Sequence, residues 1–498
     1  MSGIEPTQAQ APFVLSLDIG TSSIRAALFD AGGRLVKGSL CRRPHQLQVE
    51  SDGRSETNPD DLLDLIWACI DELIGRVGSL AEKITALASC SFVSNLLGLD
   101  RDRRAVTPLM TYADTRSSRH VQQLRSDLDE TAIHQRTGCR LHTSYWPAQL
   151  LWHQTENPDL FKKVKHWVSL GDYLELKLFG TSRVSTSVAS WTGLLNRQSL
   201  GWDETLLASL GLDPQKLSGL VDASQPVSGL KQTFAARWPQ LAKASYFPTI
   251  GDGAAANLGS QCASAARVAI TIGTSAAVRT VLSRNPEPLP RELWCYRVDR
   301  KQALLGGALS EGGNVFAWLK QVLRLPADPE LEKQLLTRQP SSHGLNVLPF
   351  LAGERSPGWQ AQAQASIHGL SAATTSVDIL HAFLEAVALR IGLVFEPLKI
   401  WLTEQPQLVA NGGALLNSPA WMQILADVLG HDLYASKAIQ ASARGAALLA
   451  LQSLGHIEDI AKLTDQFGRK FEPNRQHQAY YQQALSKQKQ LYEKMVTT

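Results

Sequence analysis

The sequence of 498 residues contains little cysteine, and none of it is arranged as a metal site. Its six cysteines are scattered, and no two follow the C-x-x-C spacing that is typical of zinc ligands or redox pairs. Sparse cysteines of this kind are typical of reduced thiols in a cytosolic protein.

Long apolar runs and a secretion signal are also missing from the sequence. No stretch approaches the roughly 18 uninterrupted apolar residues that a membrane span needs. The first residues, "MSGIEPTQAQAP", have neither a basic region nor an apolar core, so residues 1–12 are predicted to be a flexible tail and not a signal peptide. We therefore expect a cytoplasmic protein without a membrane partner.

The chain lacks an excess of charge of one sign. Its formal net charge is only +3, from 49 basic and 46 acidic residues, which argues against a nucleic-acid partner. A hydrophobic content of 44% and a charged content of 19% are typical of a well-packed globular protein. The length predicts about three domains, or two large ones.

Apolar strands alternate with helical segments along the chain, which favours an α/β fold. The first 40 residues predict a strand hairpin with a Gly-Thr-Ser-Ser turn. Residues 58–78 predict a helix with Asn58 as its N-cap and Pro59 as its first residue. Residues 141–247 are rich in tryptophan, which predicts an aromatic core, with a sugar-stacking platform as the alternative. Residues 477–495 predict a polar, exposed helix.

One short pattern occurs twice. "SLDIGTSSIRAALFD" begins at Ser16, and "ITIGTSAAVRTVLS" begins at Ile270. Gly20 and Gly273 are equivalent points in the two copies and lie 253 residues apart. A single repeat of about half the chain indicates two duplicated domains that face each other across a cleft, since a solenoid would repeat at a much shorter period.

The two Gly-Thr-Ser turns expose backbone N–H groups and hydroxyls, which can hold phosphate oxygens. Two such loops, one from each domain, could bind a polyphosphate from both sides. Asp18 precedes the first loop, and a carboxylate beside phosphate indicates an intervening Mg²⁺ ion. The alternative is that both segments are simple hairpin turns.

Asp252 lies between two glycines at a predicted strand-to-helix junction. The segment superficially matches a dinucleotide fingerprint, but Asp252 would point its negative charge at the pyrophosphate and no later carboxylate is placed to hold a ribose. The positive end of the helix keeps the Asp252 carboxylate ionised, so it can accept a proton from a hydroxyl during phosphoryl transfer. An ordinary N-cap is the alternative. In "NGGALLNSPAW", Asn417 could likewise cap the next helix or contact a flat ring.

Taken together, several motifs resemble the FGGY carbohydrate kinases of the actin-like ATPase superfamily. They occur in the order of that family over about residues 14–451. The motifs are "LDIGTSSIRAALFD", "TYADTRS", "RTGCRLHTSYWPAQLLW", "GDGAAANLGS", "TIGTSAAV", "GGALSEGGNVFAWL", "LPFLAGERSPGW", "HGLS", "NGGALLNSPAWMQILADVLG" and "ASARGAALLAL".

The resemblance implies two RNase H-like domains with ATP and a sugar in the cleft between them. It implies that Asp252 is the catalytic base and that Asp18 is the acidic residue near Mg²⁺. The remaining matched positions are those of the nucleotide and the sugar. They are Gly20, Thr21, Ser22, Gly273, Thr274, Ser275, Gly313, Gly413 and Asn417 for ATP, and Val93, Ser94, Asn95 and Tyr145 for the sugar.

Within the family, the motifs are most similar to those of gluconate kinases, with some departures. Ser94 and Asn95 replace a usual His-Ser pair, and the other departures are Tyr112 for Trp, Gln149 for Lys, Asn411 for an acidic residue and Gln440 for Glu. An anionic sugar needs a cation or several donors. The candidates are Arg140, His142 and Arg355, each with a structural role as the alternative.

We expect an ATP-dependent kinase that phosphorylates the terminal hydroxyl of a sugar acid, with gluconate as the leading substrate. A ketopentose or polyol kinase and a catalytically weak sugar-binding regulator are the alternatives. The predicted domains are 13–252 and 253–455, followed by a helical extension over 456–498. A monomer or a homodimer is expected.

Overall fold

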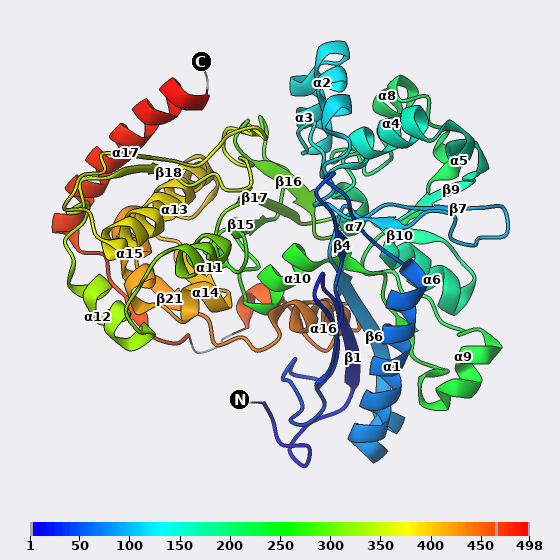
Figure 1. Cartoon of the computed structure of the whole chain (residues 1–498). Coiled ribbons are helices and arrows are strands. Elements are labelled where there is room, and N and C mark those ends of the chain that lie inside the picture. The colour runs from blue at the N-terminus through cyan, green and yellow to red at the C-terminus, as the bar shows by residue number, and fades with distance from the viewer. Residues whose placement is uncertain (1–2, 464–466, 497–498) are drawn as a thin grey trace.

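The computed structural model describes residues 3–463 and 467–496. Figure 1 shows two lobes, one formed by the N-terminal half of the chain and the other by most of the remainder. Two helices, α10 (Asp252–Gly259) and α16 (Ala441–Ser453), lie between the lobes.

The sheet of the first lobe has the strand order β3–β2–β1–β6–β12. β1 (Phe13–Ile19) and β2 (Ser23–Phe29) form the predicted antiparallel hairpin. On the other side of β1, β6 (Ile84–Ser91) pairs in parallel. The sheet is completed by β3 (Cys41–Pro44), β12 (Ser245–Tyr246) and β13 (Ile250–Gly251).

The sheet of the second lobe has the order β16–β17–β15–β14–β20–β21–β22. β14 (Arg267–Ile272) and β15 (Ala276–Leu282) form its antiparallel hairpin, and β20 (Gln407–Asn411) pairs with β14 in parallel. Its other strands are β16 (Trp294–Arg297), β17 (Ala303–Leu309), β21 (Leu433–Ala435) and β22 (Lys470–Phe471).

The two sheets share one topology. In each, an antiparallel hairpin and a third antiparallel strand lie on one side, and two parallel strands lie on the other. The run β3–β2–β1–β6–β12 therefore corresponds to β17–β15–β14–β20–β21. The predicted duplication is confirmed, and with it the α/β class with two RNase H-like domains.

Helix α1 (Pro59–Val77) begins as predicted, because the Asn58 side chain accepts the N–H of Asp60 at 3.0 Å. The other helices of the first lobe are α2 (Ser118–Asp127), α3 (Glu130–Thr137), α4 (Trp146–Glu156), α5 (Pro158–Lys163), α6 (Leu170–Phe179), α7 (Thr186–Ser190), α8 (Glu204–Ser209) and α9 (Gln232–Arg237). Its short strands are β4 (Gln48–Val49), β5 (Ser55–Thr57), β7 (Leu97–Leu99), β8 (Leu109–Met110), β9 (His166–Val168), β10 (Arg183–Ser185) and β11 (Gly219–Val221).

The tryptophan-rich segment is mostly core, as predicted. Trp146, Trp167 and Trp238 are buried in hydrophobic clusters of the first lobe. Trp191 differs, since it lies at the junction of the lobes and stacks on Tyr296 with ring centroids 3.5 Å apart.

The helices of the second lobe are α11 (Gly313–Val322), α12 (Asp328–Thr337), α13 (Ser376–Leu398), α14 (Gly413–Leu416), α15 (Pro419–Leu429) and α17 (Arg475–Val496), with the small hairpin β18 (Asn346–Leu348) and β19 (Ser366–His368). Of these helices, α13, α14 and α15 pack against the sheet, and the others pack around them. A capping box between Thr375 and Asp378 begins α13.

Helix α17 is less exposed than its polar sequence predicts. Tyr481 and Gln488 are buried, and Gln488 donates to the carbonyl oxygens of Val347 and Ala386. The helix runs along the outer side of the second lobe, beside β18 and α15 (Figure 1). Its polar side chains thus include buried groups that are satisfied by the backbone of the lobe.

Helix α16 belongs to the second half of the chain but packs on the first sheet. Ser16 of β1 donates to the carbonyl oxygen of Ala443 at 2.7 Å, and the helix lies against β1 and β6. It also crosses α10 so closely that a Cβ atom on Gly445 would lie 1.8 Å from the carbonyl oxygen of Ala255. The two helices therefore fix the junction between the lobes.

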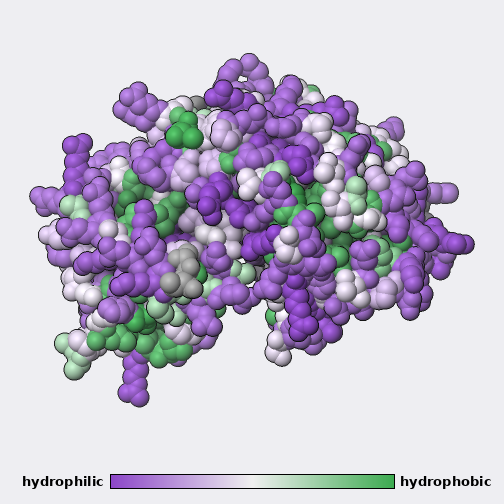
Figure 2. Space-filling model, turned by 90° about the horizontal axis from the view of Figure 1, so that it is seen from above, coloured by the Kyte–Doolittle hydropathy of each residue, from purple (hydrophilic) through white to green (hydrophobic). Residues whose placement is uncertain are grey.

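Seen from above, hydrophilic side chains cover most of the surface, and a notch separates the two lobes (Figure 2). No helix among the described residues is long and apolar enough to cross a membrane. All six cysteines are unpaired and buried, as the prediction of reduced thiols requires.

Candidate active site

The second Gly-Thr-Ser loop connects β14 to β15 and lies where two hollows meet. One hollow has a volume of about 240 Å³ and contains Asp252, and the other has a volume of about 530 Å³ and contains Gly313. Gly273 and Thr274 line both hollows. A phosphate held at this loop would thus be reachable from either side.

The smaller hollow brings together four residues that were predicted for the sugar and the reaction. Val93, Ser94, Tyr145 and Asp252 all line it. The Ser94 hydroxyl donates to the carbonyl oxygen of Trp191 at 2.6 Å, and the Tyr145 and Tyr296 hydroxyls lie 2.5 Å apart. Because Tyr296 is on β16, this bond joins the two lobes across the hollow.

Asn95 is placed differently from the other predicted sugar residues. It is buried outside the lining, and its amide is engaged at both ends. Its Nδ2 donates to the carbonyl oxygen of Phe92 at 2.5 Å, and its Oδ1 accepts the N–H of Leu170 at 2.7 Å. Because Asn95 is 1% exposed and does not line the hollow, it supports the wall of the hollow and does not face it.

Asp252 is the first residue of α10, directly after β13. The N-cap position is Gly251, which has no side chain, so Asp252 is not the capping residue that one interpretation of the sequence predicts. Burial raises the pKa of Asp252 to about 6; the nearby Arg279 lowers it and Asp18 raises it further. The carboxylate is therefore mostly ionised at neutral pH and ready to accept a proton.

Arg279 on β15 lies behind Asp252. Its Nη2 donates to Thr271 at 3.1 Å, and its Nη1 lies only 2.5 Å from where a Cβ atom on Gly253 would stand. Arg279 is 8% exposed, so its charge acts in a medium of low dielectric. It therefore favours the ionised form of Asp252.

Asp18 lies at the end of β1, next to the first loop. Its Oδ2 accepts from Arg25 at 3.0 Å, and burial raises its pKa against the effect of Arg25. Its charge also reaches Asp252. Asp18 lines neither of the two hollows. Its carboxylate fits the donor set of a Mg²⁺ ion, which prefers hard oxygen ligands and takes one or two carboxylates together with phosphate oxygens.

The first loop, residues 20–22, turns between β1 and β2. The Gly20 N–H donates to the carbonyl oxygen of Ser23 at 3.1 Å, and Gly20 accepts a bond from His45 at 2.8 Å. Thr21 and Ser22 complete the turn and line neither of the two hollows. Their predicted contact with phosphate stays a prediction.

The larger hollow is lined by the second loop, α11 and the start of α14. Gly313 begins α11, and its N–H donates to the carbonyl oxygen of Gly273 at 2.7 Å. Trp318 also lines this hollow and is 38% exposed, although large aromatic side chains are usually covered. The hollow is thus an open space beside the phosphate loop with one aromatic wall.

Gly413 precedes Ala414, which lines the larger hollow, and Asn417 follows the end of the same short helix; neither Gly413 nor Asn417 lines the hollow itself. Asn417 is exposed and does not cap the next helix, because Ser418 accepts the N–H of Trp421 at 3.2 Å instead. The capping interpretation of Asn417 is therefore wrong. The prediction that Asn417 contacts a nucleotide remains open.

The structure distinguishes the three candidate cations. Arg140 donates to Glu130 at 2.7 Å, and the two residues form a structural ion pair. His142 is held neutral, since burial lowers its pKa to about 3. Arg355 lines the smaller hollow, and its guanidinium has no hydrogen bond or ion pair with the described residues.

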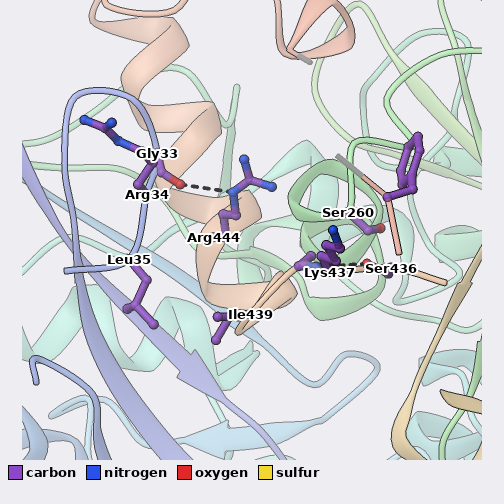
Figure 3. Close-up of a pocket in the computed structure, with 10 residues that line it drawn as sticks. Gly33, Arg34, Leu35, Ser260, Ser436, Lys437, Ile439 and Arg444 are labelled. Carbon is purple, nitrogen blue, oxygen red and sulfur yellow. Dashed lines mark hydrogen bonds between the residues drawn. The ribbon is translucent and has the colours of Figure 1, made fainter. Parts of the chain in front are cut away.

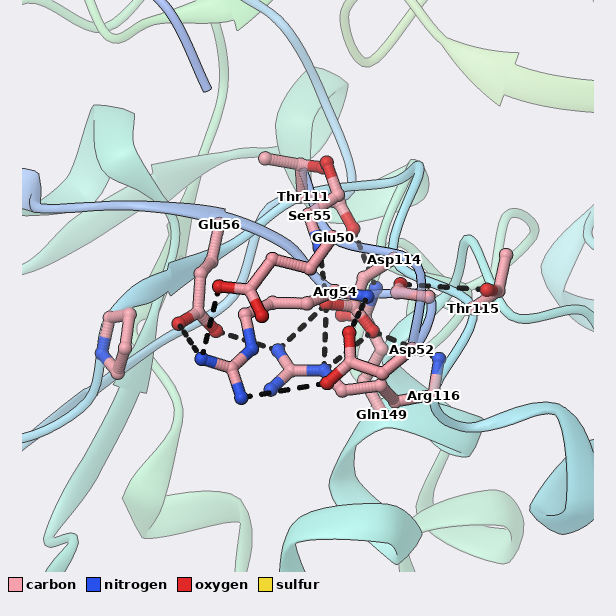
Figure 4. A network of polar contacts seen from close by, with 12 residues as sticks. Glu50, Asp52, Arg54, Ser55, Glu56, Thr111, Asp114, Thr115, Arg116 and Gln149 are labelled. Atoms are coloured by element: carbon pink, nitrogen blue, oxygen red, sulfur yellow. Dashed lines mark hydrogen bonds and ion pairs between the residues drawn. The ribbon is translucent and has the colours of Figure 1, made fainter. Parts of the chain in front are cut away.

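The segment that carries Tyr112 is held by a polar network at its outer side (Figure 4). Arg116 binds Asp114 and Glu56, each at 2.7 Å. Gln149 donates to the carbonyl oxygen of Thr111 at 3.3 Å. Gln149 is therefore occupied by the backbone, whereas Tyr112 lines the hollow and is 37% exposed.

Several lining residues were not singled out as site residues from the sequence. They are Tyr112, Ser144, Trp191, Thr271, Arg279, Trp294 and Tyr296. Arg279 directly continues the second loop motif, so a charged residue inside an otherwise apolar strand was the available signal. No comparable sequence signal existed for Trp294 and Tyr296, because only the pairing of β16 with β17 brings them to the cleft.

A separate hollow of about 210 Å³ lies at the junction of the lobes and contains none of the predicted site residues (Figure 3). There, Arg444 of α16 donates to the carbonyl oxygens of Gly33 at 3.0 Å and Gly259 at 2.7 Å. These bonds tie α16 to the first lobe and to α10, so this hollow borders a structural joint.

A cluster of metal-ligating side chains lies far along the second lobe. His343, His381 and Glu385 are close enough to share an ion. However, His343 Nδ1 accepts the N–H of Leu345 at 2.9 Å, which leaves the proton on Nε2, 2.9 Å from Glu385. The lone pair that a metal needs is therefore missing, and the cluster is a hydrogen-bonded group.

Comparisons with known proteins agree with this geometry. Residues 13–259 match the N-terminal domain of the FGGY family of carbohydrate kinases, and residues 268–454 match its C-terminal domain. A gluconokinase of Bacillus subtilis (strain 168) is 26% identical over 467 residues, covering 92% of this chain and 90% of that protein. A xylulose kinase of Lactococcus lactis subsp. lactis (strain IL1403) is 24% identical, covering 96% of each chain.

Solved structures show the same relationship. A gluconate kinase from Lactobacillus acidophilus superposes with a TM-score of 0.90 at 25% identity, covering 98% of each chain. A ligand-bound xylulose kinase from the same organism has a TM-score of 0.90 at 25% identity, covering 98% of this chain and 99% of the other. The two family matches and the duplicated lobes show that the chain belongs to the FGGY family of carbohydrate kinases.

Proposed function

We propose that this carbohydrate kinase transfers the γ-phosphate of ATP to the terminal hydroxyl of a sugar acid. Gluconate, converted to 6-phosphogluconate, is the leading candidate. The observation that carries the proposal is that one loop, Gly273–Thr274, separates a hollow containing Asp252 from a hollow containing Gly313. Sugar and nucleotide can thus approach the same phosphate from opposite sides.

The residues divide the reaction between them. Asp252 accepts the proton of the attacking hydroxyl, and Arg279 stabilises its ionised form. The backbone of Gly273, Thr274 and Ser275 holds phosphate oxygens, as do residues 20–22 of the first loop. Mg²⁺, held by Asp18 and phosphate oxygens, would neutralise charge on the phosphates. Closure of the lobes would exclude water and so limit ATP hydrolysis.

The charge of the smaller hollow supports an anionic sugar. Two cations, Arg279 and Arg355, line it together with a single carboxylate, Asp252. Relatives named as gluconokinases support the same substrate. Ser94 at the hollow, where gluconate kinases usually have His, keeps a ketopentose or a polyol as the alternative.

The proposed division of the chain follows the position of the base. Residues 13–252 would bind the sugar, 253–455 would bind the nucleotide, and 456–498 would form an extension. The first part contains the first sheet with its loop, and the second part contains the second sheet with its loop except for the edge strand β22, which lies in the extension.

A panel of sugars tests the substrate. ADP release from Mg·ATP would be measured with gluconate, xylulose, ribulose, glycerol, erythritol and xylitol. We expect turnover on gluconate to exceed that on each other sugar by at least about tenfold. Turnover on xylulose or a polyol with gluconate inert would support the alternative kinase, and sugar binding by calorimetry without ADP release would support a regulator.

The pH dependence follows from Asp252. Its pKa is raised to about 6, and the reaction requires the ionised form. We therefore expect kcat/KM for the sugar to be half-maximal near pH 6 and to fall about tenfold per pH unit below it. Initial rates between pH 5 and 8.5 measure this limb. A flat profile over that range would contradict the assignment of Asp252 as the base.

A further inference from the structure

The side chain of Arg355 is unusual among the charged groups of the cleft. Its Nε atom is buried without a partner, and its guanidinium has no ion pair with the described residues. An unpaired buried donor costs free energy unless a ligand completes it. Arg279, the other cation of the hollow, also has a buried Nε atom without a partner, but its Nη2 already donates to Thr271.

Tyr112 lines the same hollow as Arg355 and the proposed base, Asp252. The charge of Asp252 raises the pKa of the Tyr112 phenol after burial does, and that of Arg355 lowers it, so both charges reach this side chain. A linear sugar acid carries its carboxylate and its terminal hydroxyl at opposite ends, and the hollow offers a cation, Arg355, for the first and a carboxylate, Asp252, for the second.

The loop that carries Arg355 is held on both sides. Ser356 donates its N–H to the carbonyl oxygen of Ala308 on β17 at 2.9 Å, and its hydroxyl accepts the N–H of Ala308 at 3.2 Å. Next to Arg355 on the other side, Glu354 is 2% exposed. Its carboxylate pairs with Arg390 of α13.

The second partner of Glu354 comes from the C-terminal helix. The Tyr492 hydroxyl, on α17, donates to Glu354 Oε2 at 2.5 Å. The guanidinium of Arg390 lies 5.0 Å from the centroid of the Tyr492 ring, which is within cation–π range. At Gly358 a Cβ atom would stand 2.1 Å from the Tyr492 hydroxyl, so the loop closes tightly on this contact.

We propose that Arg355 binds the carboxylate of the sugar acid, and that Tyr492 positions Arg355 by holding Glu354. This inference rests on the proposed function and adds to it a specificity-determining residue. It also assigns a role to α17, whose distal end would hold a loop of the active site. A planar guanidinium can form two parallel bonds with a carboxylate, whereas an ammonium cannot.

Steady-state kinetics of substituted proteins test whether Arg355 binds the carboxylate of the sugar acid. For Arg355→Gln we expect the KM for gluconate to rise about 100-fold, since charged hydrogen bonds are lost, and the KM for Mg·ATP to change less than about twofold. Arg355→Lys should fall between, with a rise of about tenfold. Arg140→Gln is the matched control, because Arg140 is bound to Glu130, and it should leave the KM for gluconate unchanged.

The positioning role has its own matched pair. Tyr492→Phe removes only the hydroxyl and should raise the KM for gluconate about three- to tenfold with kcat retained. Tyr480→Phe makes the same change at an exposed position of the same helix and should have no effect. Equal KM values for Tyr492→Phe and Tyr480→Phe would overturn the positioning role.

The outcomes separate this inference from the proposed function. Suppose that the unsubstituted protein phosphorylates gluconate and that Arg355→Gln raises the KM for gluconate no more than Arg140→Gln does. Arg355 then does not bind the carboxylate, and the proposed function stands. If the unsubstituted protein phosphorylates only neutral sugars, the proposed function fails, and the assignment of Arg355 as the carboxylate-binding residue fails with it. Should Arg355→Gln not fold, the Arg355→Lys comparison decides.

Discussion

Replacing Asp252 by Asn is expected to lower kcat by about 10²- to 10⁴-fold while ATP binding is retained. The amide has the same shape but cannot accept a proton, and loss of a general base has effects of this size. Although Gly273 and Thr274 of the second loop line both hollows, Gly313 and Trp318 line only the hollow that does not contain Asp252, so the nucleotide side is expected to stay intact. ADP release at saturating substrate, together with an ATP titration, measures both quantities.

A control addresses the possibility that Asp252 is only a carboxylate at a helix start. Asp129 is the N-cap residue of α3, and its side chain accepts the N–H of Ala132 at 3.0 Å. Asn caps helices about as well as Asp does, so Asp129→Asn should leave kcat unchanged. If Asp252→Asn behaved like Asp129→Asn, or if it abolished ATP binding with kcat intact, Asp252 would not be the base.

The core of each lobe could be predicted from the sequence because its signals are local. The two Gly-Thr-Ser turns lie between apolar strands. The adjacent residues Asn58 and Pro59 mark the start of α1. A repeated local pattern predicts a duplicated fold without any knowledge of long-range contacts. The position of Asp252 at the start of a helix was predicted for the same reason.

The walls of the cleft could not be predicted in this way. Arg140, His142 and Arg355 are equal candidates in the sequence, and only their surroundings separate them. The partner of Arg140 is a residue ten positions earlier, whereas Arg355 has none among the described residues. Which cation is available depends on packing in three dimensions, and residue spacing does not encode it.

The prediction that Asn417 caps a helix and the prediction that α17 is exposed were wrong for a related reason. Asn417 and Ser418 are both good caps, and a shift of one residue decided which of them bonds to the helix. For α17, the polar sequence gave no sign that Gln488 would find backbone acceptors in the lobe. The capping and exposure propensities of a residue indicate which positions it can occupy, and the tertiary contacts determine which position it takes.

Replacing Gly445 by Ala is expected to destabilise the protein and to lower kcat together. The added Cβ atom would stand 1.8 Å from the carbonyl oxygen of Ala255, and backbone atoms cannot move away as a flexible side chain can. Overpacking of this kind costs about 1–3 kcal/mol. Because Ala255 and Asp252 share α10, a shift of about 1 Å at the crossing moves the base and can cost about 100-fold in rate.

Gly75→Ala provides the comparison that separates the crossing from a general effect of adding a methyl group. Gly75 lies inside α1, is exposed, and has no atom within 4 Å of its Cβ position. Alanine there should stabilise the helix by up to about 1 kcal/mol and leave kcat unchanged. Urea unfolding and steady-state rates of both proteins measure the difference. Gly445→Ala with the stability and rate of Gly75→Ala would mean that α10 and α16 move apart freely, and that their crossing does not position Asp252.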